Sequence, residues 1–157
     1  MNIFLYDPQD FSNVCTISRT LEFFWVKDCY VYDNHNLIRE KYWKSYSRRL
    51  KTQSVWAFEK INFHKIEDYI SFLKNYNWRK IITLLDEKAD SLENYKPLEN
   101  DIIIFGNEGI GLPEEIISLA DEKIYIKRIW KTQSLNLSNT VAIVVYNVIN
   151  NKWENIL

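Results

Sequence analysis

The sequence contains very little glycine. A chain of 157 residues at average usage, roughly 7%, would have about eleven glycines, and this one has three. All three lie close together, at Gly106, Gly109 and Gly111. Glycine is retained where the backbone needs a positive φ or a close approach. We therefore expect a single loop of unusual backbone geometry at residues 106–111.

The sequence also has few cysteines and a net charge close to zero. Cys15 and Cys29 form no CxxC pair and have no histidine at ligand spacing, so we expect reduced thiols, no disulfide framework and no metal site. The 20 Lys and Arg nearly balance the 21 Asp and Glu. Global charge therefore does not indicate nucleic-acid binding, and any such surface must be local.

Long apolar runs are absent as well. No stretch approaches the roughly 18 residues of a membrane span, and the first residues do not combine a basic region with an apolar one. We expect a cytoplasmic protein without a membrane segment. The length, with 46% hydrophobic and 26% charged residues, predicts one globular domain over residues 1–157.

Short apolar runs alternate with amphipathic stretches of helical length. This pattern indicates an α/β fold with a mostly parallel sheet and helices on both faces. We expect strands at residues 2–6, 29–32, 55–58, 81–85, 102–105 and 124–126.

The expected helices follow from the 3.6-residue period and from capping residues. Ser12 or Asn13 can cap a first helix, residues 65–76 carry apolar residues at helical spacing, and Pro113 suits the first position of a third. Residues 140–149 are rich in β-branched residues and could form a strand by propensity, but their length and the Ser/Asn cluster before them favour a helix.

Residues 86–101 are expected to form a solvated connecting loop, because they contain six acids against two lysines.

The glycine-containing segment FGNEGIGLP, residues 105–113, follows a strand and precedes a helix. Backbone N–H groups at such a place can hold a polar ligand at the carboxyl edge of a parallel sheet. Its GxxGxG spacing differs from the dinucleotide motif, and no Lys-Ser/Thr pair follows, as a phosphate loop requires. The alternative is a structural turn without a ligand. Glu108 favours a ligand, because a carboxylate in a glycine-lined loop is either solvated or placed to meet one.

Two further motifs contain amides and hydroxyls. Asn13 and Arg19 differ by about 120° around a helix, so they could share a site only near its edge; the alternative is a cap and an exposed arginine. In QSLNLSN, residues 133–139, polar and leucine positions alternate. We expect Leu135 and Leu137 to anchor in the core while the polar side chains point the other way. A cap cluster for the final helix is the alternative.

Taken in order, N-x5-R, strand-GNEGIGLP-helix and SLNLSN before an apolar helix resemble the motifs of the SpoU-type 2'-O-ribose methyltransferases of the SPOUT superfamily. The likeness spans nearly the whole chain, whose small size looks like that of the minimal tRNA wobble-position enzymes of the family. The resemblance implies a homodimer that uses S-adenosylmethionine to methylate the ribose of cytidine or uridine 34 in tRNA. It also implies an α/β fold with a deep C-terminal trefoil knot.

The resemblance also implies site residues. It assigns catalysis to Arg19, Asn13, Glu108, Ser134 and Asn136, with the arginine activating the ribose hydroxyl. An ordinary guanidinium stays charged, so orienting the hydroxyl and a phosphate is the more reasonable chemical role for Arg19. The cofactor would be held by backbone and apolar contacts in the knot loops, from Leu84, Gly106, Asn107, Glu108, Gly111, Ile126, Ser134 and Leu135.

Three residues depart from the family pattern. Cys15 stands where the family usually has glycine. Asn107 stands where the family frequently has proline, and Lys127 stands where a proline is common. These departures motivate one alternative, a non-catalytic RNA-binding relative. The others are methylation of rRNA or of another tRNA position, and an unrelated flavodoxin-like ligand-binding domain, which would leave the ordered motifs unexplained.

Local positive charge indicates where RNA would bind. Residues 39–51, REKYWKSYSRRLK, hold six basic residues against one acid, with three aromatic residues among them. This mixture suits phosphate contacts and base stacking, and a solvated basic helix face is the alternative. A smaller basic group precedes the Ser/Asn motif. The predicted RNA contacts are Arg39, Lys41, Lys44, Arg48, Arg49, Lys51, Lys127, Arg128 and Lys131.

Overall fold

The computed structural model describes residues 1–38, 52, 54, 56–86, 88–129, 131 and 133–154. Six of the predicted RNA contacts lie outside the described residues, namely Arg39, Lys41, Lys44, Arg48, Arg49 and Lys51.

The centre of the fold is a seven-stranded sheet in which every strand pair is parallel. From edge to edge the strands are β3 (Asn62–Lys65), β2 (Asp28–Tyr32), β1 (Asn2–Tyr6), β6 (Ile102–Phe105), β4 (Lys80–Leu84), β7 (Glu122–Tyr125) and β5 (Asp90–Ser91). The chain leaves β1 toward one edge of the sheet and leaves β6 toward the other. The carboxyl ends of β1 and β6 therefore flank a topological switch point, where open α/β sheets bind ligands.

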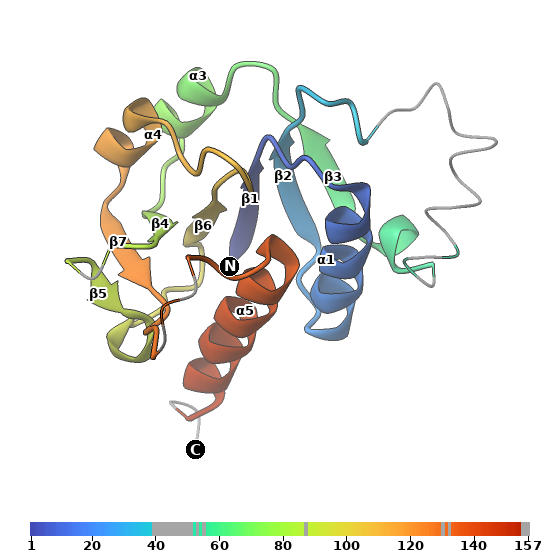
Figure 1. Ribbon diagram of the computed structural model, residues 1–157. Coiled ribbons are helices and arrows are strands. Elements are labelled where there is room, and N and C mark those ends of the chain that lie inside the picture. The colour runs from blue at the N-terminus through green and yellow to red at the C-terminus, as the bar shows by residue number, and fades with distance from the viewer. Residues whose placement is uncertain are drawn as a thin grey trace.

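Helices cover both faces of the sheet, as the alternating pattern predicts (Figure 1). One face carries α1 (Phe11–Phe23), α5 (Leu137–Glu154) and the short helix η1 (Ala57–Lys60); the other carries α3 (Tyr69–Lys74) and α4 (Glu114–Leu119). The strand IIIF of β6 is buried along its whole length, which is typical of a parallel strand covered on both faces.

The final helix confirms the helical interpretation of residues 140–149 and extends it to Leu137–Glu154. Val141, Val144, Val145 and Val148 recur at i, i+3, i+4 and i+7, and all four are fully buried against the sheet. Packing of this apolar stripe outweighs the preference of valine for strands.

The third strand differs from its prediction at residues 55–58. Ala57 and Phe58 are buried, but they belong to η1, which packs on α1. The third strand along the chain is β3, at Asn62–Lys65. β3 is an edge strand with mostly exposed side chains, so it lacks the apolar run by which a strand is recognised. The helix predicted at residues 65–76 begins only at Tyr69, because the Asp68 side chain caps it by accepting from the Ser71 N–H.

The first helix is capped by Asp10 and not by Ser12 or Asn13. The Asp10 carboxylate accepts the Ser12 N–H at 2.7 Å. Because the cap is supplied two or three residues earlier than predicted, the Asn13 side chain remains available for other contacts. Pro113, predicted inside the start of α4, is its cap residue.

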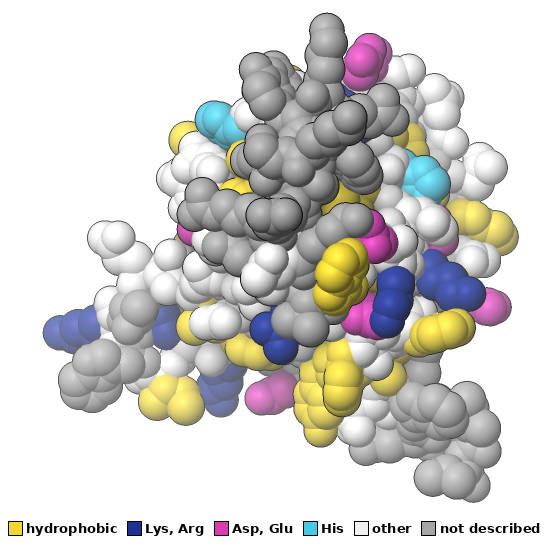
Figure 2. Space-filling model, turned by 90° about the vertical axis from the view of Figure 1, so that its right-hand side faces the viewer, with side chains coloured by type: hydrophobic (Ala, Val, Ile, Leu, Met, Phe, Trp, Pro, Cys, Tyr) yellow, Lys and Arg dark blue, Asp and Glu magenta, His cyan; other side chains and the backbone are white. Residues whose placement is uncertain are grey.

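Two exposed aromatic side chains mark the end of α1. Figure 2 looks onto the side of the molecule that carries α1 and β3 and shows hydrophobic side chains exposed on it. Phe23 and Trp25 are 82% and 77% exposed, and Trp25 has a positive φ of 59°. The Lys27 ammonium group lies 4.6 Å from the centre of the Trp25 ring.

The prediction of a solvated loop at residues 86–101 is wrong. This segment contains β5 and the short helix η2 (Leu92–Asn94), and Leu92 and Tyr95 are buried in the core. Its last residue, Asp101, is also buried.

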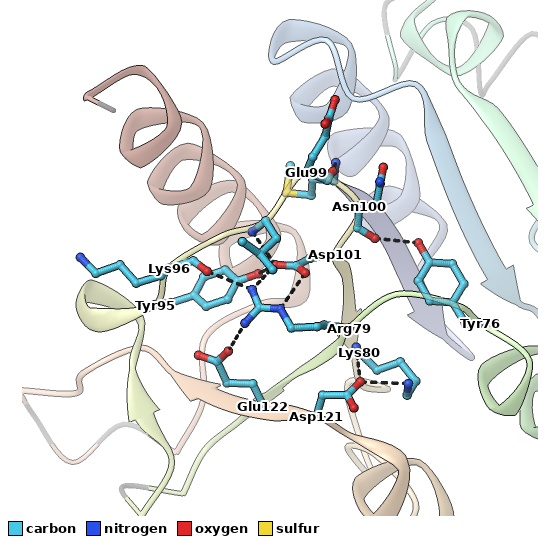
Figure 3. A network of polar contacts seen from close by, with 12 residues as sticks. Tyr76, Arg79, Lys80, Tyr95, Lys96, Glu99, Asn100, Asp101, Asp121 and Glu122 are labelled. Atoms are coloured by element: carbon cyan, nitrogen blue, oxygen red, sulfur yellow. Dashed lines mark hydrogen bonds and ion pairs between the residues drawn. The ribbon is translucent and has the colours of Figure 1, made fainter. Parts of the chain in front are cut away.

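Asp101 is the acceptor at the centre of a polar network at the amino edge of the sheet (Figure 3). Arg79 donates to both carboxylate oxygens at 3.0 and 2.7 Å, and the Tyr95 hydroxyl donates at 2.6 Å. Arg79 also donates to Glu122 at 2.9 Å. Burial and this hydrogen bond raise the pKa of the Tyr95 hydroxyl. The network therefore fixes the 86–101 segment to β4 and β7.

Candidate active site

A cavity of about 850 Å³ opens at the carboxyl edges of β4, β6 and β7. Its wall is formed by the residues that follow these strands, by Leu92, and by residues 133–135 with the first turns of α5. Most of the lining side chains are aliphatic, and a few hydroxyl and amide groups lie among them. Such a combination is typical of a cofactor or small-molecule site.

The loop between β6 and α4 is held in shape by Asn107. Its backbone exchanges two hydrogen bonds with Gly111, at 3.0 and 2.9 Å. Its side-chain oxygen accepts the N–H groups of Gly109 and Ile110 at 2.8 and 3.1 Å. Where the family frequently has proline, this chain thus stabilises the loop with an asparagine side chain.

Two of the three glycines in this loop are required by its geometry. A Cβ on Gly106 would lie 2.7 Å from the carbonyl carbon of Gly111, and Gly111 itself has a φ of 71°. At Gly109 the nearest atom to an added Cβ is 3.4 Å away. The prediction of one loop with special backbone geometry is confirmed, and the close approach at Gly106 is to the loop's own backbone.

A chain of hydrogen bonds joins the three sequence motifs. The Asn13 Nδ2 donates to Glu108 Oε1 at 2.9 Å, and the Asn136 Nδ2 donates to Asn13 Oδ1 at 2.9 Å. The Ser138 hydroxyl and N–H donate to Asn136 Oδ1 at 2.6 and 2.9 Å. All of these bonds run in the same direction and end on the Glu108 carboxylate. The amide orientations of Asn13 and Asn136 are therefore fixed by their partners.

Glu108 also bonds to the start of α1. Its Oε2 accepts the Gln9 N–H at 2.9 Å and its Oε1 accepts the Asp10 N–H at 3.3 Å. With three donors on its two oxygens, this carboxylate connects the β6 loop to the β1 loop across the switch point. Glu108 thus positions the site, since neither oxygen is left without a donor.

All eight residues predicted to hold the cofactor line the cavity. They come from four separate loops, which the fold brings together: Leu84, Gly106, Asn107, Glu108, Gly111, Ile126, Ser134 and Leu135. Leu135 was expected in the core but is 47% exposed and faces the cavity, while Leu137 is buried as predicted. Leu92 and Val144 also line the cavity and were not predicted, because Leu92 comes from a segment interpreted as a solvated loop and Val144 from the inner face of a helix.

The structure does not bring Arg19 into this network. Asn13 is 5% exposed and faces the interior, whereas Arg19 is on the exposed side of α1. Arg19 lies within α1, and its side chain makes no hydrogen bond or ion pair in the described part of the chain. The angle of about 120° between the two positions accounts for this separation.

The other family departures lie in different surroundings. Cys15 is buried in a core cluster with Val14, Leu37 and Phe58, and the cavity lining does not include it. Lys127 is exposed and lines the cavity together with Arg128, and Lys131 is exposed nearby in the sequence.

Neither cysteine forms a disulfide bond, and both are buried. Among the described residues, no group of three or more His, Cys, Asp or Glu side chains is arranged to hold a metal ion. No helix in the described ranges is both long and apolar enough to cross a bilayer.

Comparisons with known proteins agree with the ordered motifs. The model of the SpoU rRNA methylase family matches residues 1–146. The chain is 30% identical over 101 residues to the tRNA (cytidine(34)-2'-O)-methyltransferase of Escherichia coli K12, a match that covers 63% of this chain and 64% of that protein. The match therefore spans just under two thirds of the relative's length.

Two longer matches cover nearly the whole chain. A Bacillus subtilis protein to which the same tRNA cytidine-34 activity is provisionally ascribed is 27% identical over 155 residues, covering 95% of this chain and 91% of that protein. A solved structure described as concerning 2-OH methylation of C/U34 on tRNA superposes with a TM-score of 0.77 at 20% identity, over 98% of this chain and 96% of that one.

The superposition shows the SPOUT fold. The strand order and the layers fit this fold, while the trefoil knot in the chain path stays a prediction. Because the family model matches residues 1–146, nearly the whole chain, the chain belongs to the SpoU rRNA methylase family.

Proposed function

We propose that this protein is an S-adenosylmethionine-dependent RNA 2'-O-ribose methyltransferase that modifies the wobble nucleotide, position 34, of tRNA. The observation that carries the proposal is the hydrogen-bond chain Glu108–Asn13–Asn136, which joins three distant motifs beside the cavity. A family fold without chemistry would not need these two amides to be fixed in orientation.

The cavity suits the proposed cofactor. When bound, S-adenosylmethionine supplies an electrophilic methyl group on a positively charged sulfur. The aliphatic walls at Leu84, Leu92 and Ile126 would exclude water and hold the adenosine, and backbone groups of the Asn107 loop would bind its polar atoms. Transfer of this methyl group to a ribose 2' oxygen would form a carbon–oxygen bond and break the carbon–sulfur bond, and the hydroxyl proton would pass to an RNA phosphate or to water.

The chain's residues have distinct roles in this proposal. Glu108, Asn13 and Asn136 position the two loops that would meet the reacting ribose, and Ser134 lines the cavity beside them. Arg19 would orient the ribose hydroxyl and a neighbouring phosphate, since its guanidinium keeps its charge.

Full-length similarity supports tRNA position 34 as the target. Two of the matches that cover more than nine tenths of both this chain and the matched protein, the Bacillus subtilis relative and the C/U34 structure, are described for that nucleotide. The second candidate is rRNA, because the family description names it. Exposed Lys127, Arg128 and Lys131 are proposed to contact the RNA backbone in either case.

The test is transfer of labelled methyl from S-adenosylmethionine to tRNA, followed by mass-spectrometric mapping of 2'-O-methyl nucleotides in a deletion strain. We expect loss of the modification at position 34 and restoration by the wild-type gene. Loss at an rRNA nucleotide would favour the second candidate. Binding of tRNA without any calorimetric binding of S-adenosylmethionine would identify a non-catalytic relative.

Arg19 is tested in the same assay with Arg19→Ala and Arg19→Lys. We expect both variants to keep cofactor affinity and the alanine variant to lose methyl transfer. Unchanged activity in Arg19→Ala would remove this residue from the mechanism.

We also propose a homodimer. Arg19 and Phe23 are four residues apart on the exposed side of α1, and Ile143 and Tyr146 form an exposed stripe on the neighbouring α5, at 40% and 59% exposure. A second copy of the chain would cover this apolar surface and approach Arg19, which would give the arginine the partners it lacks in the described single chain.

A further inference from the structure

Asp7 has a backbone conformation that is unusual for a residue with a side chain. It directly follows β1 at the switch point and has a φ of 47°, in the left-handed region. Asparagine and aspartate tolerate this region better than most residues, but it still costs free energy relative to glycine. Such strain at the edge of a site is a reason to ask what the side chain does.

Asp7 bonds to two separate loops. Its N–H donates to the carbonyl oxygen of Tyr32 at the end of β2, and its carboxylate Oδ1 accepts the Asn34 N–H at 2.9 Å. The other carboxylate oxygen lies 3.5 Å from the Nε2 of His35. Its carbonyl oxygen accepts the Nδ2 of Asn107 at 2.6 Å. The carboxylate therefore faces the β2 loop, and the backbone carbonyl faces the β6 loop.

An aspartate within the β2 loop, residues 33–38, also holds this loop in shape. The Asp33 carboxylate is buried and accepts the N–H groups of Leu37 and Ile38, both at 2.8 Å. This loop presents His35 to solvent, with its side chain 46% exposed. In the sequence, the chain continues from this loop directly into the basic stretch that begins at Arg39.

The β6 loop depends on Asp7 through Asn107. The Asn107 amide donates to Asp7, and its oxygen accepts from Gly109 and Ile110, so one side chain carries the contact from the β1 turn to the cavity wall. Asn107 is buried, and its amide can make all three hydrogen bonds in this orientation only.

We propose that Asp7 is a positioning residue with two separable parts. Its carboxylate holds the 33–38 loop so that His35 and Asn34 contact the backbone of the substrate RNA, and its carbonyl holds Asn107 and the cofactor loop. The inference rests on the proposed function, because it assigns one loop to RNA and the other to S-adenosylmethionine.

The test uses variants that separate the two parts. Asp7→Gly suits the positive φ and keeps the carbonyl, but removes the carboxylate; Asn107→Ala removes the amide and leaves the carboxylate in place. Asp7→Asn retains an oxygen for the Asn34 N–H and serves as the conservative control. Binding of tRNA is measured by filter binding and binding of S-adenosylmethionine by calorimetry, with circular dichroism to confirm folding.

We expect Asp7→Gly to weaken tRNA binding about tenfold, which is equivalent to roughly one lost polar contact. Cofactor binding should stay within about twofold of wild type. His35→Ala should follow the same pattern with a smaller loss. Asn107→Ala should show the reverse, with weaker cofactor binding and unchanged tRNA binding. Asp7→Asn should restore most of the tRNA affinity.

Parallel losses of both affinities in Asp7→Gly, or no loss of either, would overturn the inference. These outcomes differ from failure of the proposed function. If the wild-type chain binds neither tRNA nor S-adenosylmethionine, the proposed function fails and this inference fails with it. If the wild-type chain binds both and the variants do not separate them, the inference alone fails.

Discussion

Asn13 is the residue through which the three motifs meet. Its amide donates to Glu108 and accepts from Asn136, so its two ends are not interchangeable. Asn13→Asp keeps the shape but places a second carboxylate beside Glu108, at the present hydrogen-bond distance of 2.9 Å. We expect this repulsion to displace the loops and to lower kcat/KM for methyl transfer about 100-fold.

The matched control is Asn94→Asp, the same chemical change at an exposed position in η2. It should leave kcat/KM within about twofold of wild type. Equal activity of the two variants would show that the chain of amides does not position the site.

The glycines of the β6 loop give a second prediction. Gly106→Ala would place a methyl group 2.7 Å from the backbone of Gly111, whereas Gly109→Ala would make an ordinary contact at 3.4 Å. We expect Gly106→Ala to weaken S-adenosylmethionine binding more than tenfold, because backbone atoms must move, and Gly109→Ala to change it less than about threefold. Calorimetric titration of both variants checks this order, and equal losses would contradict it.

Side-chain identity in the site could be predicted from the motifs, but its geometry could not. Asn13, Glu108 and Asn136 were found as motif residues, and the fold brings them into contact. The N–H groups of Gln9 and Asp10 that hold Glu108 could not be found, because every residue type except proline offers the same backbone donor. Ser138 lies inside the SLNLSN motif and is the second residue of α5, and its place in the motif was the only indication of its bond to Asn136.

Residues 86–101 show how a segment can be misjudged from its charge. Its acids predict a solvated loop, yet Asp101 is buried with Arg79 and Tyr95 as donors. The elements β1, β6 and α5 were predictable because each carries a clear apolar pattern. The short β3 and β5 were not, since two to four mostly exposed residues show no periodicity.

A third prediction concerns this network. Asp101→Ala leaves the Tyr95 hydroxyl and the Arg79 guanidinium without their acceptor, so we expect a loss of about 3 kcal/mol in the free energy of unfolding. Asp121→Ala is the control, because that carboxylate is 45% exposed in its pair with Lys80 and its loss should cost less than about 1 kcal/mol. Urea titrations of both variants measure the difference, and similar losses would contradict a structural role for Asp101.

The edge pair β2–β3 gives a prediction in pH. A hydrogen bond with His64, at 2.8 Å, lowers the pKa of the Asp28 carboxyl below its ordinary value of 3.8. A lowered pKa in the folded state stabilises the fold above pH 3.8, and this stabilisation is lost as the pH falls through the folded-state value. At neutral pH we expect Asp28→Asn to be less stable by about 0.5 kcal/mol, a small amount because both partners are exposed.

The difference should vanish in strong acid, where Asp28 is protonated in both states. Urea unfolding at neutral pH and in acid checks this, with Glu67→Gln as an exposed control. A difference that persists unchanged in acid would show that the carboxylate charge is not its source.

At the scale of the whole molecule, the exposed stripe on α5 predicts the oligomeric state. The chain has a mass of 18.9 kDa, and sedimentation equilibrium should give about twice this value if the proposed homodimer forms. Tyr146→Glu should yield the monomer mass, because it places a charge in the covered surface. Trp78→Glu, at an exposed aromatic residue outside α1 and α5, should leave the dimer intact. A monomeric wild-type chain would contradict the proposal.

The confinement of glycine to one loop has a consequence for the other turns. In the described ranges, left-handed backbone occurs at four residues with side chains, namely Asp7, Trp25, Asn36 and Trp56. At each such residue the left-handed backbone costs the folded state about 1 kcal/mol of free energy, a cost that glycine would not have. Selection for thermal tolerance should therefore accept glycine first at Trp25, whose ring is mostly in solvent, and last at Asp7, where the carboxylate holds a neighbouring loop.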